Sequence, residues 1–378
     1  MRLTTHRVAA ATLTAALAYL LLAPESHAPT RYAVKDFGTL SNGTLSIATG
    51  INGRGQVSGV AFLPDNETAR AVVGSENKLY DLGTLGGSVA VATAISDAPQ
   101  AIGASFTEGD ENVRAFVCDR DGMRDLGSLG GDASVAQGIN SKGVIIGVSQ
   151  TRTGDPHAFR YENGEWRDIF PASVYSEATA ISDTDRIAGY YYDPRTELVK
   201  AFVWHEKKIM VLPTLGGSVT VALGINDAGQ TVGVAETKPE TYHAFVFDGS
   251  KLTDLGTLGG DFSAARSVNN KGQIVGFSTT RPGDQSLPHG FVTENNKLTD
   301  LNTRLDNKRG WHIALATGIN ERGQIAATGI RGQEAHALRL DPVGENALTP
   351  EAFALLVLGG SGGVVAWGEG IARRRRRG

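Results

Sequence analysis

Short runs of alternating polar and apolar residues recur along the chain and are separated by glycine-rich turns. Lys251–Leu255 alternates in this way, which is typical of a half-buried β-strand. The runs at 219–225, 230–234 and 244–247 are short, apolar and partly β-branched, and Asn226–Gly229 has the composition of a hairpin turn. No window shows sustained helical periodicity with caps. The pattern therefore predicts an all-β fold.

This strand pattern repeats seven times. A segment of the type Asp-Leu-Gly-Thr-Leu-Gly-Gly, clearest at Asp81–Gly87, returns every 43 to 46 residues. Each unit then carries three further landmarks, seen in the fifth unit as Gly224–Asn226, Gly229–Gly233 and His243–Phe245. Repeats 1 to 7 begin at Asp36, Asp81, Asp125, Asp168, Val211, Asp254 and Asp300. Four short strands in about 44 residues predict the blade of a β-propeller.

The two ends of the repeat array predict how the ring closes. Repeat 7 finishes at His336–Pro342 without an outer strand, and the strand-like segment Tyr32–Phe37 precedes repeat 1. We therefore expect a seven-bladed β-propeller of four-stranded blades, closed by the N-terminal strand. The small, Ala-rich strand of each unit, such as Ala90–Ile95, should border the central channel. The alternative is an open β-solenoid, for which this period is long and end caps are not evident.

The N-terminus has the layout of a secretory signal. Arg2, His6 and Arg7 form a basic start, and Val8–Ala23 is an apolar segment that is too short for a comfortable membrane span. Small residues at the positions that a signal peptidase reads predict cleavage after Ala28. The alternatives are a buried helix or a retained anchor.

The C-terminus carries a second predicted targeting segment. Pro350 and Glu351 precede a stretch that is apolar and small from Ala352 to Trp367, and residues 352–372 are long enough to cross a bilayer once. The chain then closes on the arginine cluster Arg373, Arg374, Arg375, Arg376 and Arg377. Such a cluster stays on the cytoplasmic side and would leave the body outside. The predicted organisation is a signal peptide at 1–28, the propeller at 29–343, a linker at 344–349 and a sorting tail at 350–378.

Composition and charge narrow the classes of function. The chain has 378 residues, 48 glycines, one cysteine and a net charge of −4. One cysteine excludes an intramolecular disulfide framework and a cysteine-based zinc site. The terminal segments carry +1 and +3, which leaves −8 on the body. An acidic, exported body is a poor binder of nucleic acid. We expect a monomer that meets a membrane only through its terminal segments.

The landmarks resemble a known family. The ordered recurrence of Asp-Leu-Gly-Thr-Leu-Gly-Gly, Gly-Ile-Asn, Gly-Gln-x-Val-Gly and His-Ala-Phe from about Asp36 to Pro342 is similar to the HAF repeat of exported bacterial proteins. The tail resembles the PEP-CTERM sorting signal, although Ala352 stands where that signal has a second proline. The resemblance implies recognition by an exosortase-type enzyme and a place at the cell envelope, the outer surface or the extracellular matrix. The glycines at 359–363 are also similar to tails processed by rhomboid-like proteases.

Glycine-rich, histidine and acidic segments of the repeats are the candidates for phosphate and metal binding. The Gly-Thr-Leu-Gly-Gly segments lack the helix and the Lys-Ser/Thr pair of a phosphate loop. Four histidines share one repeat position, namely His157, His243, His289 and His336, and the other units have Arg70, Arg114 and Lys200 there. This exchange predicts a repeated hydrogen-bond donor and not a metal ligand. Acidic loops such as Glu108–Glu111 lack calcium-loop spacing, and Cys118 is expected to be buried. We expect no metal and no cofactor.

Function in a repeat protein should lie where the repeat breaks. Repeat 4 carries Tyr190, Tyr191 and Tyr192, and repeat 7 inserts a segment that contains Trp311 and His312. Exposed aromatic side chains there could contact a polysaccharide or a surface protein, whereas buried ones would only fill interfaces. The prediction is a non-catalytic, exported binding or structural protein that is not an enzyme. The alternative is a secreted propeller enzyme acting on polysaccharides or lactones, which would need a convergent carboxylate pair or a metal cluster.

Overall fold

The computed structural model describes residues 30–171, 175–283, 287–294 and 296–343. Tyr32–Pro342 forms one compact unit, and the second unit comprises Met1–Arg31 and Val343–Gly378. The predicted cleavage at Ala28 and the predicted sorting signal from Pro350 and Glu351 to Arg373–Arg377 lie outside the described residues. Within the described part of the chain, no helix is long and apolar enough to cross a membrane.

The strands follow one another as antiparallel neighbours in sets of four. Set 1 is β2 (Ser46–Ile51), β3 (Val57–Phe62), β4 (Ala69–Ser75) and β5 (Lys78–Asp81). Set 2 is β6 (Gly86–Ile95), β7 (Ala101–Thr107), β8 (Val113–Asp119) and β9 (Gly122–Gly127). Set 3 is β10 (Gly130–Ile139), β11 (Ile145–Thr151), β12 (Pro156–Glu162) and β13 (Glu165–Asp168). Set 4 is β14 (Ser176–Ile181), β15 (Ile187–Asp193), β16 (Leu198–His205) and β17 (Lys208–Val211).

The remaining sets keep this order, with one exception. Set 5 is β18 (Thr220–Ile225), β19 (Thr231–Lys238), β20 (Thr241–Phe247) and β21 (Leu252–Gly256). Set 6 is β22 (Ser263–Val268), β23 (Ile274–Ser278), β24 (His289–Glu294) and β25 (Lys297–Asp300). Set 7 is β26 (His312–Ile319), β27 (Ile325–Arg331) and β28 (Glu334–Val343), and its fourth strand is β1 (Arg31–Asp36), which pairs with β28. Two short 3₁₀ helices lie at Glu108–Asp110 and Leu301–Thr303.

The sets are not all separate sheets, which differs from the prediction of individual four-stranded blades. Sets 1, 2 and 3 form one continuous twelve-stranded sheet. Single parallel pairs, Ala69 with Val89 and Val113 with Ala133, make these two joins. The physical reason is that β6 and β10 begin early, within their Leu-Gly-Gly segments, and so reach the third strand of the preceding set.

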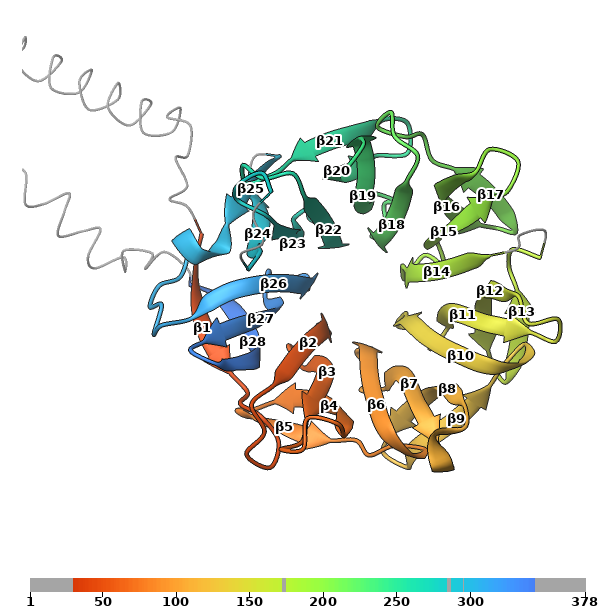
Figure 1. The fold of residues 1–378 in the computed structure, drawn as a ribbon, viewed down its shortest axis with the longest axis horizontal. Helices are drawn as coiled ribbons and strands as arrows, with labels where there is room; N and C mark the ends of the chain where they lie inside the picture. The colour runs from red at the N-terminus through yellow and green to blue at the C-terminus, as the bar shows by residue number, and fades with distance from the viewer. Residues whose placement is uncertain (1–29, 172–174, 284–286, 295, 344–378) are drawn as a thin grey trace, which may run out of the picture. The chain divides into compact units, whose positions relative to one another are not determined.

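The first strand of each set faces a central opening (Figure 1). Thr93, Ala94 and Ile95 of β6 line this opening, as the small-residue pattern predicts. The third strands of sets 2 to 6 each carry a fully buried phenylalanine, as at Phe159, Phe202 and Phe245. Each hydrophobic cluster spans two neighbouring sets, so that the core lies in layers between them.

The landmark glycine of the second strand makes room for this aromatic layer. A Cβ atom on Gly189 would meet the carbonyl oxygen of Glu177 and would lie 2.8 Å from the ring of Phe202. The same crowding by a preceding inner strand and a phenylalanine occurs at Gly147, Gly233 and Gly276. This glycine recurs because the second strand packs closely against both the first strand and the phenylalanine ring of the third strand.

The asparagine of each Gly-Ile-Asn landmark ties neighbouring sets together. Its side-chain oxygen accepts a backbone N–H group four residues later and, in most repeats, one two residues later, as at Asn140 with Lys142 N at 3.1 Å and Val144 N at 3.0 Å. Its amide nitrogen reaches a backbone carbonyl in the next set. These bonds run from Asn52 to Ser96, Asn140 to Ser182, Asn226 to Asn269, Asn269 to Asn320 and Asn320 to Asn52, at 2.9 to 3.2 Å. The last of them joins set 7 to set 1.

The histidine of each His-Ala-Phe landmark pairs with the aspartate that begins the following repeat. His157 Nδ1 lies 2.6 Å from Asp168, and His289 Nδ1 lies 2.8 Å from Asp300. Lys200, which replaces the histidine in repeat 4, instead pairs with Asp193 at 2.7 Å. His243 and His336 also contact aspartates, namely Asp254 and Asp36. The contacts are those of a repeated hydrogen-bond donor, and the aspartate partner is a feature that the sequence analysis did not predict.

Candidate binding site at the central opening

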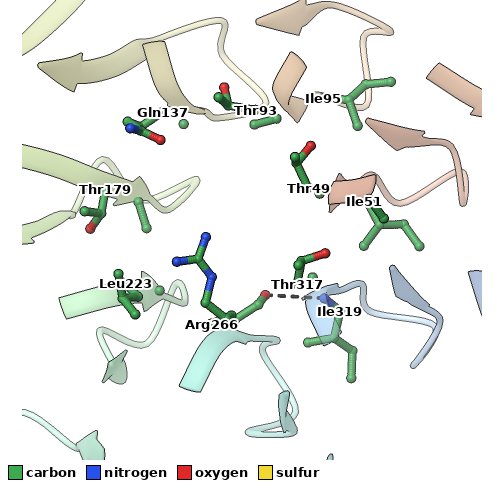
Figure 2. Close-up of a pocket in the computed structure, with 18 of the residues that line it drawn as sticks. Thr49, Ile51, Thr93, Ile95, Gln137, Thr179, Leu223, Arg266, Thr317 and Ile319 are labelled. Carbon is green, nitrogen blue, oxygen red and sulfur yellow. Dashed lines mark hydrogen bonds between the residues drawn. The ribbon is translucent and has the colours of Figure 1, made fainter. Parts of the chain in front are cut away.

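Alternate residues of the inner strands face the opening at three levels. The aliphatic level consists of Ile51, Ile95, Ile139, Ile181, Ile225, Val268 and Ile319. Two residues earlier in each strand lies the polar level of Thr49, Thr93, Gln137, Thr179, Leu223, Arg266 and Thr317. Two residues earlier again is the third level of Ile47, Val91, Val135, Glu177, Val221, Ala264 and Leu315. Most members of the first two levels line a cavity of about 490 Å³ (Figure 2).

Threonines at the polar level have a structural task. The Thr49 hydroxyl donates to the Ala92 carbonyl at 2.7 Å, and Thr93 and Thr179 make the same contact with the next inner strand. Each of these hydroxyls is thereby committed to holding two neighbouring sets together. Three side chains depart from threonine at this level. Leu223 is apolar, and Gln137 and Arg266 are the two that have polar groups for another role.

Glu177 is the one charged residue at the third level, where all other repeats have an aliphatic side chain. Its carboxylate accepts hydrogen bonds from Gln137 Nε2 at 3.1 Å, from the Tyr175 hydroxyl at 2.9 Å and from the Tyr190 hydroxyl at 2.7 Å. The two tyrosine hydroxyls also lie 3.3 Å apart. Three donors from two sets of strands therefore fix the position of this carboxylate.

Burial keeps both phenols in the protonated, donating form. Desolvation raises the pKa of Tyr190 far above its usual value, and the hydrogen bond with Tyr175 and the charge of Glu177 add to the rise. Desolvation likewise raises the pKa of Tyr175. Because neither phenol ionises near neutral pH, both remain donors to the Glu177 carboxylate.

Arg266 supplies the opposite charge. Its side chain extends from β22 toward the centre of the opening, where it is accessible to solvent (Figure 2). Protein nevertheless surrounds the guanidinium closely enough for desolvation to lower its pKa, which the charge of Glu177 partly offsets. Arg266 makes no side-chain hydrogen bond or ion pair with the described residues. It is thus a cation whose five N–H donors are available.

A second cavity, also of about 490 Å³, brings these groups together. Gln137, Glu177, Tyr190 and Arg266 line it with Thr179. The rest of its wall is aliphatic, formed by Val199, Val219, Val221 and Leu223. Glu177 is the one carboxylate among the residues that line the two cavities. The arrangement can hold a small ligand that has an apolar face, several hydroxyl groups and a charge.

The predicted aromatic contacts divide between this site and the core. Tyr190 lines the second cavity. Tyr191 packs against Phe170, with ring centroids 4.6 Å apart, and the backbone of Tyr192 donates to the Tyr175 carbonyl. All three tyrosines belong to set 4. The fold therefore does not bring them together with Trp311 and His312, the other predicted contact residues.

That pair is held within set 7 and its neighbours. Trp311 is 5% exposed and stacks under the guanidinium of Arg331 at 4.3 Å. His312 Nε2 lies 3.0 Å from the Pro288 carbonyl oxygen, and its ring meets that of His289 edge to face. Neither residue lines the central cavities. Among the described residues, no group of three or more His, Cys, Asp or Glu side chains could hold a metal.

Sequence reasoning found Tyr190 but missed Glu177, Gln137 and Arg266. A usable signal exists in the sequence, because aligning the repeats on Gly-Ile-Asn places Glu177 against six aliphatic residues. The same alignment places Arg266 against neutral side chains. What the alignment does not give is that residues of sets 3, 4 and 6 share one cavity.

Comparisons with known proteins bear on the fold. No protein-family model and no curated protein matches the chain. The β-propeller domain of the Trilobed protease from Pyrococcus furiosus is similar over 80% of this chain and 99% of that one, with 10% identity and a TM-score of 0.52. The fold is that of a β-propeller.

Two further solved structures are similar at a lower level. The acylaminoacyl peptidase of Pyrococcus horikoshii is similar over 82% of this chain and 54% of its own, with 10% identity and a TM-score of 0.47. A putative TolB from Agrobacterium tumefaciens is similar over 61% of this chain and 90% of its own, with 11% identity and a TM-score of 0.44.

The prediction that this protein is not an enzyme requires correction. The similar propeller from Pyrococcus furiosus is a domain of a protease. The prediction was wrong because it equated a repetitive β-sheet ring without a visible catalytic motif with a protein that has no enzymatic role. A propeller can be one part of an enzyme, and chemistry is set by sites and not by the fold.

Proposed function

We propose that this chain is an exported, seven-bladed β-propeller of the cell surface or extracellular matrix that binds a polysaccharide at its central opening. Closure of the ring is supported by contacts between set 7 and the N-terminal part of the chain. Phe37 N donates to the Ala337 carbonyl at 3.2 Å, and Ala337 N donates to Ser46 Oγ at 2.8 Å. The bond from Asn320 to Asn52 continues the asparagine series across the same junction.

Export is proposed from the two terminal segments. The basic and apolar start of the chain favours cleavage after Ala28, and the tail from Pro350 to Arg377 favours sorting by an exosortase-type enzyme. Cell fractionation combined with mass spectrometry of the mature termini tests both steps. Mature surface protein that still carries Arg373–Arg377 would contradict removal of the tail.

The observation that carries the binding proposal is the paired departure from the repeat at Glu177 and Arg266. Glu177 stands where the other repeats have an aliphatic residue, and placing its carboxylate beside two tyrosines removes it from water at a free-energy cost. The hydrogen bonds that it gains return little net stability. Carboxylate, amide and phenol groups around an aliphatic wall are suited to a ligand that has many hydroxyl groups and apolar C–H faces. Pockets of this size and composition commonly hold small ligands.

Binding is tested on the purified full chain with a panel of soluble oligosaccharides. Glu177→Gln removes the negative charge, and Tyr190→Phe removes one hydroxyl donor. Both should weaken binding of the neutral oligosaccharides of the panel about tenfold or more. Tyr80→Phe is the matched control, because Tyr80 is exposed on the outer strand β5. Equal binding by all three variants would contradict the proposal.

A further inference from the structure

We propose that the ligand of this site carries a carboxylate, as a uronic acid does, and that Arg266 binds that carboxylate while the sugar ring lies against the aliphatic wall of the second cavity. The inference rests on the proposed function and specifies its ligand class.

Glu177 makes no hydrogen bond or ion pair with Arg266, although both side chains line the second cavity. Gln137, Tyr175 and Tyr190 already donate to its two oxygens. Glu177 therefore stabilises the positive charge of Arg266 across the cavity without occupying its N–H groups. A guanidinium presents its donors in a planar fork, and a carboxylate is the planar acceptor that matches it with two parallel bonds.

The second cavity also has an aliphatic wall that the rest of the ligand must cover. Val199, Val219, Val221 and Leu223 form one wall of the cavity, and Gln137, Thr179 and Tyr190 supply polar groups beside it. A pyranose ring has C–H groups on its faces and hydroxyl groups around its rim. It can therefore place a face on the aliphatic wall and its rim on the polar groups, whereas a simple inorganic anion would leave the wall uncovered.

The order of the levels fixes the direction from which the ligand enters. At the turn end of the inner strands, the aliphatic level offers six isoleucines and a valine, which would strip a charged sugar of water without replacing its hydrogen bonds. The third level, which contains Glu177, lies toward the other end of these strands. An acidic sugar should therefore reach Arg266 from this end, where the hydrogen bonds that Glu177 accepts reduce its repulsion of the sugar carboxylate, and stop at the aliphatic level.

The charge of the body limits the length of the ligand. The body carries a net charge of −8, which repels a long polyanion that lies along its surface. One carboxylate at the end or on a branch of a glycan avoids most of that repulsion. The site is therefore specific for a single acidic sugar unit, bound with one-to-one stoichiometry.

Isothermal titration of the full chain tests this inference with three probes: a disaccharide that ends in glucuronate, the same disaccharide with glucose in that place, and acetate. We expect the glucuronate probe to bind about tenfold or more tighter than the glucose probe. Arg266→Gln should remove this preference. Arg124→Gln is the matched control, because Arg124 pairs with Asp119 on the outer strand β9 and is mostly exposed. A thermal melt shows that each variant folds, and Arg266→Gln should unfold no earlier than the wild type.

Each unfavourable outcome has a distinct meaning. Equal affinity for the glucuronate and glucose probes would overturn the carboxylate inference and leave sugar binding intact. Acetate binding as tightly as the glucuronate probe would reveal a plain anion site and overturn the sugar class. Binding of none of the sugars by a folded wild type, with the wider oligosaccharide panel also negative, would overturn the proposed function itself.

Discussion

Replacing Asn269 by alanine should lower the free energy of unfolding by about 2 to 4 kcal/mol. Asn269 is 3% exposed, and its side chain makes four hydrogen bonds. Its amide nitrogen donates to Gln273 Oε1 at 2.8 Å and to the Asn320 carbonyl at 3.1 Å. Its oxygen accepts from Lys271 N at 3.1 Å and from Gln273 N at 3.0 Å.

The size of this change in unfolding free energy depends on whether each partner group of Asn269 can find another hydrogen bond after the substitution. A net contribution of about 0.5 to 1.5 kcal/mol for each bond gives an upper limit near 6 kcal/mol for four bonds. Lys271 is exposed, and its N–H can turn to water, so its share is small. The Asn320 carbonyl belongs to a buried residue and loses its partner in the next set. About 2 to 4 kcal/mol remains.

Urea denaturation followed by tryptophan fluorescence measures this change, and serine provides the matched control. Repeats 2 and 4 naturally carry Ser96 and Ser182 at the asparagine position. The Ser182 hydroxyl accepts from Arg186 N at 3.2 Å and so keeps the turn, but it does not provide the amide donor to the next set. Asn269→Ser should therefore cost about half as much as Asn269→Ala. A loss below about 0.5 kcal/mol for alanine, or equal losses for both, would refute the reasoning.

Three further outcomes are expected. Burial raises the pKa of Asp36, but the hydrogen bonds from His336 and from the Gly38 backbone and the nearby positive charges together lower it overall, so this carboxylate stabilises the fold above its unfolded pKa and loses that effect as pH falls. His336→Ala should shrink the acid-side loss by roughly 1 kcal/mol or less, measured by urea midpoints across the acid range; an unchanged pH profile would argue against the pairing. Trp311→Ala should cost about 3 to 5 kcal/mol in a thermal or urea melt, because the ring is buried beneath Arg331; a smaller loss would place the ring outside the core. Burial, and then the charge of Asp119, raises the pKa of the Cys118 thiol, so a thiol reagent should label it only after unfolding; rapid labelling of the native protein would disprove this.

The repeated contacts were open to prediction because each is local or recurs at a fixed spacing. The pairing of His157 with Asp168 spans eleven residues and returns in other repeats, so the exchange of histidine for arginine or lysine already indicated a donor. Tyr190 was visible as a break in repeat 4. By contrast, the approach of Arg266 to Glu177 joins inner strands of sets 4 and 6. It depends on which side chains face the opening, and no local pattern encodes this.

The parallel joins between the first three sets were hidden for a related reason. The first residues of β6 and β10 belong to glycine-rich segments that look like turns in the sequence. Their backbones nevertheless extend along the preceding set, with Val89 opposite Ala69 and Ala133 opposite Val113. Glycine permits either an extended or a left-handed conformation, so the residue type alone does not choose between a turn and a strand.

The polar level of the opening loses hydrogen bonds between neighbouring sets where threonine is replaced by another residue. A threonine there contributes a bond to the next set, which is worth about 1 kcal/mol. Gln137 compensates by reaching Glu177 in the next set, whereas Leu223 has no polar group and the Arg266 side chain makes no hydrogen bond with the described residues. Three of the seven positions thus lack a link to the next set within the described part of the chain, because the Thr317 hydroxyl bonds only the Ala326 carbonyl of its own set, at 3.4 Å. Losses of stability that are confined to one cavity are the usual mark of selection for binding or chemistry. The remainder of the ring can bear them, because the asparagine bonds and the aromatic layers join the same sets independently of the polar level.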